Sequence, residues 1–307
     1  MNICIKQGYV IGNIQMNEQN VGWLNGLFGV VIFAGSLPAT RIAVMGFSPE
    51  FITGARASIA SILALFILWF FQAKPFKQNL PQRTDWIPLL IVAFGVVFGF
   101  PFFTALALEH ISSARALVFV ALLPLTTAIF GVLRSAERPS LPFWIFALLG
   151  SFFVMGFMLQ GDQGHLLGPG DLLMILAIIV CGLSYAEGGR LAKTLGGWQV
   201  ICWALVISLP LMLLLSFYYL PKQWSTVPIS AYAGLLYVSL FSMLIGFFFW
   251  YKGLALGGIA KVGQIQLLQP FIGLVFSAII LGESVTLGMI AVSMAVMLCV
   301  LMAKRYT

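Results

Sequence analysis

Three glutamines lie in one long apolar stretch of the chain, residues 254–270, which reads LALGGIAKVGQIQLLQP. A buried amide that lacks hydrogen-bond partners is costly, so each glutamine needs a partner. That partner is either a neighbouring helix or a small solute. Gln266 and Gln269 are three positions apart and share a helical face, whereas Gln264 points elsewhere. All three are candidate substrate-binding residues, and both interpretations stay open for each.

Charged side chains inside apolar segments are the second candidate group. Arg56 lies about two turns into one segment. It either extends to the membrane surface near Glu50 or anchors a solute carboxylate, which suits the bidentate guanidinium. Glu187 is the deepest carboxylate. It either pairs with Arg190 one turn on and anchors the helix end, or takes part in gating or proton exchange.

Aromatic residues near the expected centre form the third group of candidates. Most aromatics in so apolar a chain face lipid or pack helices, and two of these could belong to the interfacial belt. As a cluster they favour a solute with apolar or aromatic parts. The Gly-Gly pair at 188–189 adds the hypothesis of a flexible gate. The aromatic candidates are Phe102, Phe103, Tyr185, Trp203, Trp250 and Tyr251.

The elements that must hold these residues are membrane spans. The chain has 307 residues, of which 61% are hydrophobic and 8% charged, whereas a soluble domain carries about 25% charged residues. A spanning helix needs about 20 mostly apolar residues. Ten segments are predicted as spans: 22–44, 50–71, 86–108, 112–133, 141–159, 171–192, 199–219, 230–251, 259–281 and 285–303.

The distribution of Lys and Arg predicts the orientation of these spans. Of the sixteen basic residues, twelve fall in segments on one side, three on the other, and Arg56 inside a span. Because Lys and Arg accumulate in cytoplasmic loops, the side with twelve is predicted to be cytoplasmic and to hold both termini. The protein is then expected in the inner or plasma membrane. Residues 1–21 are predicted to be a disordered cytoplasmic tail, and 304–307 the cytoplasmic C-terminus.

Landmarks recur at a spacing of 146–148 residues and predict an internal repeat. Each copy would hold five spans, so the second copy enters the membrane from the opposite side. Inverted repeats are typical of alternating-access transporters, with the solute bound between the halves. Symmetric acids at the helix ends are predicted to cap helices or fix loops. The matching pairs include Ile111 with Ile259, Arg115 with Lys261, Pro124 with Pro270, and Glu137 with Glu283.

The chain resembles the EamA-type branch of the drug/metabolite transporter superfamily. The pattern A-L-x-x-I-S-S-A-R-A…P-L…E-R at 107–138 is echoed by A-L-x-x-I-A-K-V…P-F…G-E-S at 255–284, and residues 33–60 resemble that family's first two spans. The resemblance implies an all-α integral membrane protein of ten transmembrane helices, arranged as two inverted five-helix repeats at 22–160 and 161–303. It also implies transport of small organic molecules, amino acids among them, with export expected. Where many members carry a Glu before the ninth-span proline, this chain has Gln269.

The sequence contains few of the features that other classes of function would require. The basic residues are scattered, which argues against nucleic-acid binding. No catalytic group, metal site or cofactor is predicted, since no H-E-x-x-H, close C-x-x-C or P-loop motif occurs. The expected partners are a small organic solute and the lipid bilayer, with a homodimer left open. A non-transporting sensor or scaffold, or an intramembrane enzyme, remains as an alternative.

Overall fold

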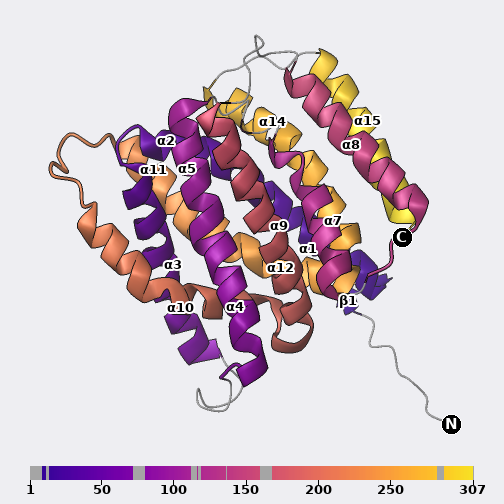
Figure 1. Cartoon of the computed structure of the whole chain (residues 1–307), viewed down its shortest axis with the longest axis horizontal. Coiled ribbons are helices and arrows are strands. Elements are labelled where there is room, and N and C mark those ends of the chain that lie inside the picture. Colours follow the sequence, from indigo (N-terminus) through magenta and orange to yellow (C-terminus); the bar gives the residue numbers. More distant parts are fainter. Residues whose placement is uncertain are drawn as a thin grey trace.

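The computed structural model is a single bundle of helices packed side by side (Figure 1). The long apolar segments become helices because a helix satisfies every backbone hydrogen bond within its own segment. The structure describes residues 9–11, 14–71, 80–111, 116, 119–135, 137–159, 168–281 and 287–306.

Helices of the first half are interrupted at two places. A break at Gly35 separates α1 from α2, and a π-helical stretch, η3, separates α4 from α5. The elements are α1 (Glu18–Ala34), α2 (Ser36–Val44), α3 (Pro49–Phe71), the 3₁₀ turn η2 (Arg83–Asp85), α4 (Trp86–Val92), η3 (Ala93–Gly99), α5 (Phe100–His110), α7 (Leu123–Ser135) and α8 (Leu141–Leu159).

Helices of the second half are also interrupted, and one interruption corresponds to η3 of the first half. A second π-helical stretch, η4, lies between α11 and α12, and a 3₁₀ stretch, η5, precedes Pro270. The elements are α9 (Pro169–Leu195), α10 (Gly197–Tyr218), α11 (Ile229–Tyr237), η4 (Val238–Ile245), α12 (Gly246–Gly257), α13 (Ile259–Gly263), η5 (Gln264–Leu268), α14 (Gln269–Leu281) and α15 (Leu287–Arg305).

Six continuous helical segments among the described residues are long and apolar enough to cross a membrane: 18–44, 49–71, 83–110, 169–195, 197–218 and 229–257. Three shorter apolar helices lie at 123–135, 141–153 and 294–303. The chain is therefore a multi-pass membrane protein. The full count of ten spans stays a prediction, since parts of 112–118, 160–167 and 282–286 lie outside the described residues.

Part of the N-terminal tail is ordered. Strands β1 (Tyr9–Ile11) and β2 (Ile14–Met16) pair antiparallel, with Tyr9 opposite Met16. Helix α1 then begins at Glu18, capped by Asn17, whose side chain accepts from the backbone N–H of Gln19. The prediction of a disordered tail through residue 21 is therefore wrong for these segments.

The bundle has two ends, which neighbouring residues define. At the Arg41 end, Arg41 donates to the Leu108 carbonyl oxygen, so α2 and α5 finish together. Helices α9 and α11 begin at this same end, because Gly170 adjoins His110 and Ala231 adjoins Gly46. The opposite end, called the Lys252 end, holds the finish of α7, α9 and α12. Helices α8 and α15 pair at one edge of the bundle (Figure 1).

Helix α1 packs directly against α12, backbone to backbone. A Cβ placed on Gly253 would lie 2.7 Å from the backbone nitrogen of Gly26, and one on Gly22 would lie 2.4 Å from that of Gly257. Such close approach is what small residues provide between membrane helices. This contact joins the two halves of the chain, since α1 lies in the first half and α12 in the second.

Replacing Gly253 by Ala should therefore destabilise the protein. The new methyl group would meet the backbone of Gly26 and Gly22, which cannot rotate away, and overpacking of this kind costs about 1–3 kcal/mol. The matched control is Gly156→Ala on α8, where no atom of the described residues lies within 4 Å of the added Cβ. Thermal unfolding in detergent should show a lower Tm for G253A only. Equal melting of both variants would contradict the close contact.

Candidate functional site

A cavity lies at mid-depth in the bundle, and both halves of the chain line it. Its polar lining comes from α2, α3, α5, η4 and α14: Ser36, Thr40, Arg56, Thr104, Ser242 and Gln269. Phe33, Phe100, Tyr185 and Phe247 supply aromatic surface. The volume available to water is about 30 Å³, and one water needs roughly 10–15 Å³ by this measure. In this conformation the cavity holds little more than water.

Arg56 places a positive charge in this cavity. Its side chain is 6% exposed, and it starts seven residues into α3, about 10 Å from the Arg41 end. One Nη donates to Ser242 Oγ at 3.2 Å, and that hydroxyl lies 2.9 Å from Ser36 Oγ. Nε has no hydrogen-bond partner among the described residues. The surface interpretation is therefore wrong, and the side chain faces the interior.

Burying this guanidinium has a substantial energetic cost. An arginine at the centre of a spanning helix costs about 2.5–3.5 kcal/mol on insertion scales. Its only described hydrogen-bond partner is a neutral hydroxyl. Such a residue is kept inside a membrane protein where it lines a polar pathway or contacts a ligand.

Only one of the three glutamines lines the cavity. Gln269 does so, and its Nε2 donates weakly to the Phe33 carbonyl oxygen at 3.4 Å. Gln264 and Gln266 are buried in η5, and none of their amide atoms has a hydrogen-bond partner among the described residues. The Gln266 amide lies beside the Tyr185 hydroxyl, behind the cavity wall. Of the two residues predicted to share a helical face, only Gln269 therefore lines this cavity.

The aromatic candidates separate into lining, supporting and distant groups. Tyr185 lines the cavity, and its ring lies 5.3 Å from that of Trp250. Trp250 and Tyr251 are fully buried, which excludes the interfacial belt, and their Nε1 and hydroxyl groups lack partners among the described residues. Trp203 is buried in the core without lining the cavity.

Phe102 and Phe103 are half-buried and lie outside the cavity lining. Phe102 stacks instead on Phe98 at 5.1 Å. From the same helix, Phe100 and Thr104 reach the cavity. The π-helical stretch η3 just before them adds a residue to the turn, and this rotates the side chains of α5 relative to those of a regular helix. The sequence gives no direct signal of that rotation.

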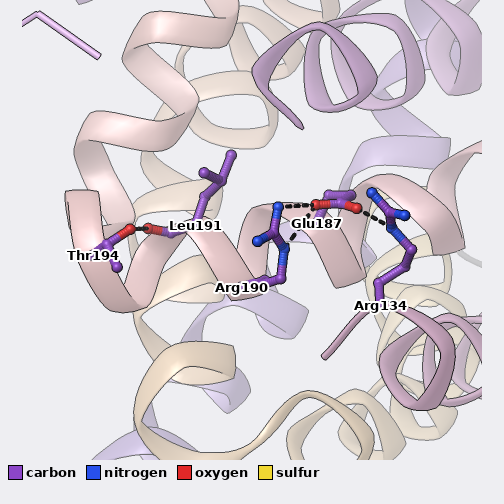
Figure 2. Close-up of polar contacts among 5 residues, drawn as sticks. All are labelled: Arg134, Glu187, Arg190, Leu191 and Thr194. Carbon is purple, nitrogen blue, oxygen red and sulfur yellow. Dashed lines mark hydrogen bonds and ion pairs between the residues drawn. The ribbon is translucent and has the colours of Figure 1, made fainter. Parts of the chain in front are cut away.

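Near the Lys252 end, Glu187 is held by two arginines (Figure 2). Its side chain is 0% exposed. Arg190, on the same helix, contacts Oε2 through Nη2 at 2.9 Å and through Nε at 3.1 Å. Arg134, from the last turn of α7, contacts Oε1 through Nε. The predicted pair with Arg190 is present, and Arg134 is the partner that the sequence interpretation missed. We call this trio the arginine clamp.

A second acid links the halves at the same end. Glu137 accepts from the backbone N–H groups of Ile259 and Ala260, both at 2.8 Å, and so caps α13. Gly258 precedes these residues with a φ of 90°, which favours glycine. The predicted capping role is confirmed for Glu137, whereas Glu283 lies outside the described residues.

The segment between the cavity and the clamp is closed by close packing. Helix α9 runs unbroken through Gly188, and a Cβ there would lie 2.2 Å from the ring of Tyr251. The helix is therefore not broken at 188–189 in this conformation, and a flexible gate there stays a prediction. Within the described residues, no cluster of three or more His, Cys, Asp or Glu could hold a metal ion.

Comparisons with known proteins find one family model and several relatives named as transporters. A model of the "EamA-like transporter family" matches residues 20–159 and 168–304. A Bacillus subtilis (strain 168) protein, "Uncharacterized transporter YdeK", is 56% identical over 292 residues, covering 95% of this chain and 99% of that protein. "Uncharacterized transporter YyaM" from the same organism is 24% identical over 261 residues, covering 82% and 83%.

A solved crystal structure resembles the fold with a TM-score of 0.74 at 17% identity, covering 94% of this chain and 97% of that chain. That likeness concerns the fold alone. The family match spans most of the sequence, and a relative more than half identical extends over nearly all of it. The chain therefore belongs to the EamA-like transporter family of membrane proteins.

Proposed function

We propose that this membrane transporter moves small organic solutes by alternating access, without ATP hydrolysis of its own. The observation that carries the proposal is the cavity at mid-depth, which is lined by both halves and combines polar with aromatic surface. A solute site between two halves near the membrane centre is typical of secondary transporters. Amino acids and related metabolites or drug-like compounds are the proposed solutes, and export the proposed direction.

Reciprocal packing supports an inverted repeat of five helices in each half. Helix α1 of the first half packs on α12, and α9 of the second half packs on α5. If a twofold axis relates the halves, α1 corresponds to α9 and α12 corresponds to α5. The two contacts are then equivalent. The π-helical stretches η3 and η4 fall at residues 93–99 and 238–245, close to the spacing of the repeat.

A layer of unsatisfied polar groups supports a second conformation. Between the cavity and the Lys252 end, Gln264, Gln266, Trp250 and Tyr251 have buried polar atoms with no partner among the described residues. Leaving such groups unpaired costs about 1–3 kcal/mol each. Opening toward the Lys252 end would admit water or solute to them, so these groups favour a state other than the closed one.

The arginine clamp is the proposed inner gate. It lies at the end where Lys and Arg predominate, which the positive-inside rule places in the cytoplasm with both termini. Because Arg134 and Glu187 come from different halves, their contact closes that end. Both arginine side chains are partly exposed, at 44% and 40%, so they can move into water when the gate opens.

Replacing Gln269 by Ala should lower transport about tenfold, because a solute group facing it loses a hydrogen-bond partner. The measurement is uptake of radiolabelled amino acids, amines and aromatic acids into sealed vesicles containing the purified protein. Gln223→Ala, at an exposed loop position, is the matched control and should transport as the wild type does. If no compound moves faster than into protein-free vesicles, the transport proposal is refuted.

Replacing Glu187 by Gln should open the inner gate more often, because its charge-assisted contacts with both arginines weaken. The probe is Cys181, which lines the cavity, in a variant whose other three cysteines are alanine. Labelling by a membrane-impermeant thiol reagent from the cytoplasmic side should accelerate about tenfold. Glu109→Gln, an exposed acid at the Arg41 end, is the control. An unchanged rate in folded E187Q would exclude the clamp as gate.

A further inference from the structure

The cavity carries an uncompensated positive charge. Among the described residues that line the cavity, Arg56 is the only one ionised at neutral pH, and none is Asp or Glu. Among the described residues, the only polar contact of its guanidinium is with the neutral hydroxyl of Ser242. Glu187, the buried charge of the arginine clamp, has by contrast two oppositely charged partners.

Unused hydrogen-bond donors surround the same space. Arg56 Nε is buried without a partner among the described residues, and a guanidinium can only donate. Thr104 Oγ1, on α5, is likewise buried without a partner there. Ser36 and Ser242 hydroxyls lie 2.9 Å apart beside the guanidinium, and one of their protons is free to turn elsewhere. This site lacks an acceptor with negative charge.

The rest of the cavity lining is suited to the apolar part of a solute. Phe33, Phe100, Tyr185 and Phe247 present aromatic surface, with the rings of Phe33 and Phe247 4.9 Å apart. A molecule that satisfies both parts of the cavity has a carboxylate at one end and an apolar or aromatic group at the other. A cationic group finds no acid in the lining.

We propose that the solute is an amphipathic organic anion whose carboxylate is held by Arg56, with Thr104 and the Ser36–Ser242 pair as neighbouring donors. This assignment deepens the transport function proposed above and rests on it for its biological role. The fork of the guanidinium matches the two oxygens of a carboxylate, so both donors and charge are satisfied together. The small volume of the closed cavity means that its walls separate as the solute enters.

A series of compounds that differ only in charge tests the proposal. The probes are 3-phenylpropanoate, its neutral amide 3-phenylpropanamide, and the cation 3-phenylpropylamine. Binding to the purified full-length protein in detergent is measured by calorimetry and by the shift in Tm. The anion should bind and raise the Tm, while the amide and the amine bind at least about 30-fold more weakly, as expected when a buried charge pair loses one partner.

Variants of Arg56 identify the group responsible. R56Q should weaken binding of 3-phenylpropanoate about 30-fold or more, and R56K less, because lysine keeps the charge but loses the fork. The control is R41Q, which removes an equal charge from an exposed residue outside the cavity and should leave binding unchanged. If R56Q does not fold, the affinities of R56K and R41Q for 3-phenylpropanoate are compared with that of the wild type. Weaker binding by R56K alone supports the assignment.

Three results would overturn the assignment: tighter binding of the amine or amide, no response to the carboxylate, or full binding of the anion by R56Q and R56K. Vesicle flux separates this inference from the transport proposal. Saturable movement of a neutral or cationic compound, undiminished in R56Q, would leave a transporter whose substrate is not an anion. Binding of the anion without flux of any compound would leave the site assignment intact and refute transport.

Discussion

Burying an ion inside an apolar bundle is costly, so the free energy of this fold depends on what each buried charge contacts. Two buried charges, Glu187 and Arg56, differ in what they contact. Glu187 is enclosed and held by two arginines, which is a compensated arrangement internal to the protein. Arg56 is enclosed and, among the described residues, meets only a neutral hydroxyl. Glu187 and its arginines link the two halves of the chain. Arg56 has a positive charge without a negative partner among the described residues, and the carboxylate of a ligand can be that partner.

Among the described residues, the ion pair and the charged helix cap that link the two halves lie near the Lys252 end. Arg134 and Glu137, close together in the first half, reach Glu187 and the start of α13 in the second. The two arginines of the clamp are partly exposed, so water can replace Glu187 as their partner when the contact separates. The glycine contact of α1 with α12, by contrast, consists of buried backbone and has no such substitute. The bundle therefore combines contacts that can separate with one that cannot.

The sequence predicted much of the scaffold and less of the site. Glu137 could be identified as a cap because its position recurs in the repeat, and Arg56 and Gln269 stood out as polar groups in apolar segments. The contact of Arg134 with Glu187 could not be foreseen, because 53 residues separate them in the sequence. In addition, the positive-inside rule already accounts for an arginine near a helix end, so Arg134 did not stand out. Phe102 was misplaced because the π-helical stretch η3 departs from the regular helical period on which its assignment depended. Gln266 lies outside the cavity lining although positions three apart share a face in an α-helix and also in a 3₁₀ stretch such as η5.

Those departures from helical regularity share a location. The break at Gly35, the π-helical stretches η3 and η4, and the 3₁₀ stretch η5 each contribute or directly adjoin a cavity residue, namely Ser36, Val96, Ser242 and Gln269. No described residue of α8, α10 or α15 lines the cavity, and α8 and α15 form their own pair at the edge (Figure 1). Irregular backbone survives at membrane depth only where protein or a water-filled space surrounds it. Small torsional changes in these irregular segments would alter the cavity walls. The site therefore lies where the helices of the bundle can move.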